Sequence, residues 1–130
     1  MKKTFAVLVL IFLTNMVGMI YNMYLTWWFD TGMHFLGGFF MAVFMWQYLG
    51  DSLPKDKFKK ALALVGVVSF IGVVWEFAEY IASLTLIEPI YNNFGIRTYF
   101  IGDLDDTMGD LLMDILGAFT FVLALKRKKT

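Results

Sequence analysis

The sequence predicts an all-α, polytopic integral membrane protein that forms a four-transmembrane-helix bundle with both termini in the cytoplasm. The first observation is composition: 59% of the 130 residues are hydrophobic, against roughly 45–50% in a soluble domain. The second is distribution, because the apolar residues gather in four blocks, each about long enough to cross a hydrocarbon core of ~30 Å. The third is the placement of basic residues. Together they predict a single membrane domain over residues 1–130.

The predicted spans cover residues of about 4–24, 33–49, 61–86 and 106–125. The first begins with two lysines and an apolar run, as a signal peptide does, but no small-x-small cleavage site follows, so we expect an uncleaved span. Gly50, Pro54 and dense charge predict a turn between the second and third spans. Residues 87–105 are more aromatic and less charged, and are expected to form an outer loop.

Basic side chains indicate the orientation, because lysine and arginine concentrate on the cytoplasmic side of membrane proteins. Only Arg97, of 11 basic residues, falls on the outer side of a four-span arrangement. The others precede the first span, separate the second from the third, or follow the last: Lys2, Lys3, Lys55, Lys57, Lys59, Lys60, Lys126, Arg127, Lys128 and Lys129. An odd number of spans would break this sorting. We therefore expect a multi-pass protein of the plasma (inner) membrane.

Ionisable residues inside the spans line up by depth once this topology is assumed, at ~1.5 Å of rise per helical residue. Their spacings of three or four residues put each set on one helical face. Three layers are expected: a rim of Asp30 and Asp106, a middle layer of His34, Glu79 and Asp110, and a floor of Glu76 and Asp114. Small residues such as Gly37, Gly38, Gly109, Gly117 and Ala118 would let the helices approach closely. The pattern predicts a polar pocket open to the outside.

Structural roles must be weighed against functional ones. Acidic residues near helix N-termini, such as Asp30, are commonly caps, and a lone His34 is commonly a hydrogen-bonded structural residue. Glu76, Asp110 and Asp114 differ, because a charge at that depth costs at least ~2.5–3.5 kcal/mol and intramembrane ionisable residues are functional candidates by default.

The clustered carboxylates cannot all be bare anions, because like charges and burial each disfavour ionisation. They could share protons, pair with a base such as His34 or Arg97, or bind a divalent cation. Carboxylates with one imidazole suit Mg, Mn, Ca or Zn, and the absence of cysteine excludes thiolate sites. The candidate metal ligands are His34, Glu76, Glu79, Asp106, Asp110 and Asp114. The candidate catalytic residues are His34, Glu79 and Asp110, and the candidate substrate-binding residues are Asp30 and Arg97.

Three segments resemble the signatures of YjdF-like inner-membrane proteins: "DTGMHFLGGFF" (Asp30 to Phe40), "WEFAEYI" (Trp75 to Ile81) and "IGDLDDTMGDLLMDILGA" (Ile101 to Ala118). The pattern is also similar to VanZ-like proteins, which usually have Gln at the position of Glu79 and Asn at that of Asp110. The resemblance covers the last three spans. It implies a small envelope protein but supplies no reaction, although the VanZ-like link to glycopeptide tolerance hints at lipid-linked or cell-surface chemistry.

Three functions remain open. One is a metal-dependent enzyme acting on a lipid or lipid-linked phosphate at the outer leaflet, with membrane lipid as partner and no nucleic acid. Another is a proton- or cation-coupled carrier, for which four spans without an inverted repeat would require a homo-oligomer. The third is a non-enzymatic binding or assembly protein whose buried carboxylates share protons and lock the helices together, without a cofactor.

Overall fold

The computed structural model describes residues 1–127 of the chain, with side chains as far as Leu125, so Lys128 and Lys129 lie outside the described residues. The elements are α1 (Lys2–Ile20), η1 (Met23–Leu25), α2 (Trp27–Leu49), η2 (Gly50–Ser52), α3 (Lys57–Thr85), α4 (Ile87–Phe94) and α5 (Leu104–Arg127), where η denotes a short 3-10 helix. No strand occurs within residues 1–127. The all-α prediction is confirmed.

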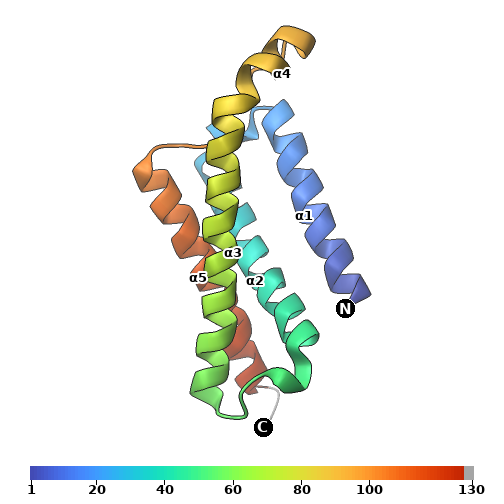
Figure 1. Ribbon diagram of the computed structural model, residues 1–130, viewed down its shortest axis with the longest axis vertical. Coiled ribbons are helices and arrows are strands. Elements are labelled where there is room, and N and C mark those ends of the chain that lie inside the picture. Colours follow the sequence, from blue (N-terminus) through green and yellow to red (C-terminus); the bar gives the residue numbers. More distant parts are fainter. Residues whose placement is uncertain (128–130) are drawn as a thin grey trace.

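Four long helices alternate in direction along the bundle, and α4 projects beyond the end of α3 (Figure 1). The most extensive packing joins α2 to α5, and α3 packs against both of them. Helix α1 packs on α2 at the edge of the bundle (Figure 1). The described ends of the chain both lie away from α4 (Figure 1).

Three helices are long and apolar enough to cross a membrane: Lys2–Ile20, Lys57–Thr85 and Leu104–Leu125. Helix α2 has sufficient length, with 23 residues, but glycines, tryptophans, His34 and Gln47 reduce its hydropathy. The helices therefore support a membrane protein with several spans.

Several helices begin before the predicted spans because polar caps start them outside the apolar blocks. Helix α3 begins at Lys57, where the Asp56 side chain accepts a hydrogen bond from the backbone N–H of Lys59 at 2.9 Å. Asp103 similarly accepts from the N–H of Asp106 at 3.0 Å, and α5 begins at Leu104. These are N-cap interactions, which satisfy donors at the first turn of a helix.

The connections on the α4 side of the bundle also differ from the expected boundaries. Helix α1 ends at Ile20, and Asn22 then adopts a left-handed conformation with φ of 55°. Helix α2 begins at Trp27, six residues before the expected start at 33. The predicted outer loop of residues 87–105 contains α4, which ends at Phe94 and is followed by Gly95 in a left-handed conformation with φ of 67°. Glycine adopts that conformation without a Cβ penalty.

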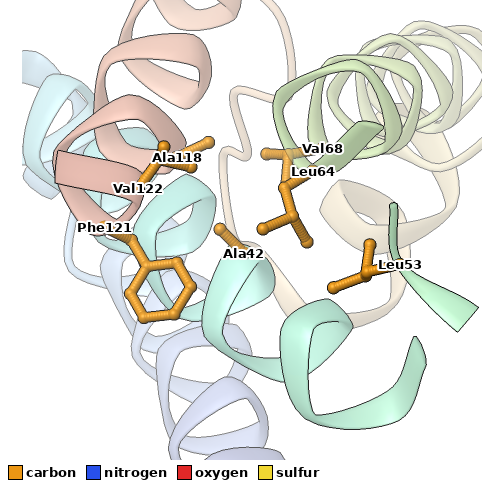
Figure 2. Close-up of a cluster of buried hydrophobic side chains, with 7 residues drawn as sticks. All are labelled: Ala42, Leu53, Leu64, Val68, Ala118, Phe121 and Val122. Carbon is orange, nitrogen blue, oxygen red and sulfur yellow. The ribbon is translucent and has the colours of Figure 1, made fainter. Parts of the chain in front are cut away.

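The apolar core lies between α2, α3, α5 and the segment that follows η2 (Figure 2). Its buried members are Ala42, Leu53, Leu64, Val68, Ala118, Phe121 and Val122. Leu53 comes from the turn after η2, so the core occupies the half of the bundle nearest that turn (Figure 2).

Two glycines bring the backbones of α2 and α5 together. A Cβ added at Gly38 would stand 2.2 Å from the backbone oxygen of Asp114, and one added at Gly117 would stand 2.2 Å from that of Phe35. Such distances are far below van der Waals contact, so glycine is required at both positions. The predicted close approach is confirmed for Gly38 and Gly117. At Gly37 and Gly109 an added Cβ would meet nothing within 4 Å.

Candidate functional site

The buried face of each packed helix changes from apolar to polar along its length. On α2 the buried residues at four-residue intervals are Ala42, Gly38 and His34. On α3 they are Leu64, Val68, Gly72 and Glu76, and α5 buries Ala118, Asp114 and Asp110. Because i and i+4 share a face, the face that forms the core also delivers the polar groups. Along α2 and α3, the buried glycines Gly38 and Gly72 lie between the apolar core and the polar site.

His34 is the centre of this polar site. Its Nε2 atom lies 3.6 Å from Oδ1 of Asp30, 3.8 Å from Oδ2 of Asp110 and 3.9 Å from Oε1 of Glu76. These separations suit charge interactions better than hydrogen bonds. Only 7% of His34 is exposed. One imidazole thus contacts carboxylates from α2, α3 and α5.

Asp114 faces the other nitrogen of the same ring. Its Oδ2 lies 3.5 Å from Nδ1 of His34, at the long limit of a hydrogen bond. A Cβ at Gly72 would stand 2.4 Å from that oxygen, while Gly38 adjoins the Asp114 backbone. The carboxylate therefore fits between α2 and α3 because both helices carry glycine there. Gly72 was not recognised from sequence, although it continues the four-residue spacing to Glu76.

A cavity of about 370 Å³ opens beside the polar site. Its polar lining includes Asp30, Glu76, Glu79, Asp106 and Asp110, and residues 99–103 form part of its wall. We call it the outer pocket. Glu76 is 8% exposed, and neither of its carboxylate oxygens has a hydrogen-bond partner. Its charge contact with His34 is 3.9 Å long, and burying a carboxylate without hydrogen bonds is costly.

Two aromatic residues of the site were missed by sequence reasoning. The Nε1–H of Trp75 donates a hydrogen bond to Oε1 of Glu79 at 2.8 Å; their i, i+4 spacing was the available signal. Tyr24, at the end of the first predicted span, lines the outer pocket, and its hydroxyl donates a hydrogen bond to Oδ1 of buried Asn15. Burial first, and then nearby carboxylates such as Asp30, raise the pKa of the Tyr24 hydroxyl above its usual range, so it remains a donor.

Comparison with known families places this geometry in context. A family model described as a predicted membrane protein (DUF2238) matches residues 1–130. The chain belongs to this family. The YjdF-like resemblance is thereby confirmed, since the YjdF-like family is DUF2238, whereas the similarity to VanZ-like proteins is not supported.

One relative is a Thermotoga maritima protein described as uncharacterized, which is 35% identical over 124 residues. The match covers 92% of this chain and 59% of the relative, so the chain spans less than two thirds of that protein's length. No solved structure matches the chain. In this DUF2238 protein, the three segments that carried the resemblance lie on α2, on α3 and on or just before α5, and supply the carboxylates around His34.

Two overlapping groups of side chains in this DUF2238 protein could hold a metal ion. One contains Asp30, His34 and Asp110, the other His34, Glu76 and Glu79, and in each group the ligand atoms lie within 4.8 Å of one another. The expected layer of His34, Glu79 and Asp110 is confirmed only for the approach of His34 to each carboxylate, because Glu79 and Asp110 fall in different groups. The three expected layers instead converge on one ring, with Glu76 and Asp30 beside the same nitrogen as Asp110.

Three predicted site residues lie apart from those metal-capable groups. Asp106 is exposed at the outer pocket, and Asp114 faces Nδ1 alone. Arg97 is exposed, with its guanidinium 5.9 Å from the centroid of the Tyr91 ring. No ion pair joins Arg97 to a carboxylate among the described residues, so the expected contact with the rim carboxylates is absent from this structure.

Proposed function

We propose that the outer pocket binds a divalent cation and acts on the phosphate of a lipid or lipid-linked substrate at the outer face of the membrane. The observation that carries this proposal is Glu76, whose two carboxylate oxygens are buried without a hydrogen-bond partner beside the outer pocket. A cation would supply the missing partner. It would also offset the charge of the surrounding carboxylates, which have only one imidazole among them.

The spacing of the donors is consistent with a hard cation. Ligand atoms within 4.8 Å of one another are no further apart than two oxygens on opposite sides of Ca²⁺, each ~2.4 Å from the ion. Mg²⁺ and Zn²⁺ bind their ligands at about 2.0–2.2 Å and would require the side chains to move inwards. Carboxylate-rich donor sets favour Mg, Mn or Ca. His34 would join Asp110 and Asp30, or Glu76 and Glu79, as ligands.

The carboxylate lining also limits the substrate. A phosphate monoanion or dianion would be repelled by Asp30, Glu79 and Asp110 unless a cation lay between them. With the cation bound, it would polarise the phosphate and lower the pKa of a bound water. With Asp30, His34 and Asp110 as ligands of the cation, Glu79 would remain free to accept the proton of the water that attacks phosphorus. The same carboxyl group would then return that proton to the oxygen that leaves with the lipid.

The proposed orientation places this pocket on the outer side. We infer four membrane crossings, with α2 as the crossing of lowest hydropathy. With 23 residues α2 is longer than α1, which has 19, and it packs against both α1 and α5. Both termini would then be cytoplasmic, in agreement with the sorting of basic residues. Residues 99–103, which wall the pocket, would lie in the outer connection.

Metal analysis of the purified protein tests the cation. We expect Mg, Mn or Ca to co-purify, and the metal affinity of Asp110→Asn and His34→Ala to fall by roughly 10–100-fold or more, because losing even an outer ligand partner has such an effect. Asp30→Asn should matter less, because 19% of the Asp30 side chain is exposed against 8% for Asp110. Asp105→Asn, an exposed change at the start of the same helix, is the matched control. The proposal would be contradicted by a metal-free wild-type protein. It would also be contradicted if Asp105→Asn lowered the metal affinity as much as Asp110→Asn does.

A second candidate function is a helix lock without catalysis. It is favoured by the contacts of one buried His34 with carboxylates from α2, α3 and α5. Protonated carboxylates sharing hydrogen bonds with the imidazole would hold these helices in register. Such a protein would bind no metal, and replacing a carboxylate with an amide would leave it folded.

A further inference from the structure

A second cavity, of about 240 Å³, lies between α1, α2 and α3. Its walls are mainly hydrocarbon: Leu8, Ile11, Phe12, Met33, Met41 and Ile71. Its polar lining includes His34 and Asp114. We call it the apolar cavity. An apolar cavity of about 150 Å³ stays dry and can bind benzene, so this one has room for a longer hydrocarbon segment.

The ring of His34, which lines the apolar cavity, lies between carboxylates that belong to the two cavities. The three carboxylates near Nε2, from Asp30, Glu76 and Asp110, all line the outer pocket. Asp114, near Nδ1, lines the apolar cavity. One buried side chain therefore lies within 3.9 Å of lining residues of both cavities, of which one is polar and the other mainly hydrocarbon.

Helix α1 separates the apolar cavity from the lipid phase only through side chains on the side that faces α3. Its backbone contacts α2 and η1 but not α3 within the described residues. Side chains close the gap instead, and Phe12 meets Trp75 edge to face with ring centroids 6.1 Å apart. Phe12 is 46% exposed, and an exposed aromatic side chain can change rotamer far more readily than packed helices can separate. A lipid chain could therefore enter between α1 and α3.

We infer that the apolar cavity binds one acyl chain of a membrane phospholipid, whose phosphate end lies at His34. Hydrocarbon is the abundant apolar ligand around membrane-spanning helices, and the cavity ends at the polar site. The placement of the phosphate end rests on the proposed function. The acyl-chain site itself rests only on the cavity, its lining and the position of α1.

Glycines provide matched variants for a test. Gly37 lines the apolar cavity, and an added Cβ there would meet nothing within 4 Å. Gly37→Leu therefore starts a larger side chain from an open position in the cavity wall. Gly66 on α3 is exposed, lies outside the cavity lining and also has nothing within 4 Å of an added Cβ. Gly66→Leu is therefore the control. Both changes replace a helical glycine and raise helix propensity.

The experiment uses the full chain in lipid nanodiscs containing phosphatidylglycerol with a photoactivatable diazirine in its acyl chain. After irradiation, labelled peptides are mapped by mass spectrometry. We expect labelling of Phe12, Met33 and Ile71 in wild type and Gly66→Leu, and a decrease of roughly tenfold in Gly37→Leu, since a leucine side chain displaces several buried methylenes. Gly37→Ala should give a smaller decrease in labelling. This variant keeps the experiment informative if Gly37→Leu fails to fold.

Exposed Phe70 and Leu62, which face away from the core, serve as the reference for lipid contact in every sample. Equal cavity labelling in wild type and both Gly37 variants, or labelling confined to the exposed reference residues, would overturn the inference. Metal content measured on the same samples separates the two proposals. Metal-free protein with labelling sensitive to Gly37 would retain the acyl-chain site and refute the cation. Metal-loaded protein whose cavity labelling does not change in the Gly37 variants would retain the cation and refute the acyl-chain site.

Discussion

Oδ2 of Asp114 lies 3.5 Å from Nδ1 of His34, across the most extensively packed pair of helices, α2 and α5. This contact exists only because the helices approach so closely that Gly38 touches the Asp114 backbone. The polar site and the packing of the bundle are thus one structural feature, and substitutions in either should affect both.

Neighbouring glycines on α2 should respond oppositely to the same substitution. A Cβ at Gly38 would stand 2.2 Å from the Asp114 oxygen, so Gly38→Ala must force α2 and α5 apart, at a cost of about 1–3 kcal/mol. Gly37→Ala meets open space and should stabilise the helix by up to ~1 kcal/mol. Thermal unfolding in detergent measures both. Equal effects of the two alanines would contradict the close approach of α2 and α5.

Removing His34 should destabilise the folded protein. His34→Ala leaves buried Glu76, Asp110 and Asp114 without their shared base, and breaking a buried ion pair typically costs about 3–5 kcal/mol. We expect the loss in unfolding free energy to be near the lower end, because the four contacts are 3.5–3.9 Å long. Unfolding in a graded denaturant measures it. The additional variant Asp114→Asn in the His34→Ala background should recover part of the loss, since it removes one uncompensated charge.

Metal should reverse the sign of the stability change caused by Asp110→Asn. In Ca- or Mn-containing buffer, wild-type protein should gain about 2.7 kcal/mol at a metal concentration 100 times the dissociation constant, and the variant should gain much less. After chelation, Asp110→Asn should be neutral or mildly stabilising, because it removes a like charge from a crowded site. Melting temperatures with and without metal report both effects. Stabilisation by the amide under both conditions would favour the helix lock.

The hydrogen bond between Tyr24 and Asn15 should contribute to the packing of α1. Tyr24→Phe leaves the carbonyl of buried Asn15 without that donor, which costs about 1–3 kcal/mol for an unsatisfied buried group. Tyr21→Phe is the control, because Tyr21 is 74% exposed. Thermal melts should separate the two variants, and indistinguishable melting temperatures would contradict a structural role for this bond.

Reporter fusions can test the orientation. A fluorescent protein and an exported phosphatase, fused separately after Gly95 and at Thr130, report opposite sides of the membrane. With four crossings and cytoplasmic termini, fluorescence should be high at Thr130 and phosphatase activity high after Gly95. An active phosphatase at Thr130 would place the outer pocket on the wrong side for the proposed substrate.

The sequence by itself determined the helical class, the approximate helix positions and the residues of the polar face. Hydrophobic blocks and four-residue spacing are local properties of a chain. They predicted one polar pocket, with His34, Glu79 and Asp110 in one layer and Glu76 in the layer below. The family signatures lie on the same residues. These features required no knowledge of how far apart the helices stand.

Only the tertiary structure decided how these groups meet. The division of carboxylates between Nε2 and Nδ1 of His34, the exposure of Asp106 and the position of Arg97 over Tyr91 depend on distances between helices. Those distances are determined by contacts such as Gly38 with Asp114, which lie far apart in the chain. The apolar cavity depends likewise on where α1 packs, because a cavity is the space left by several helices and has no periodicity in any one of them.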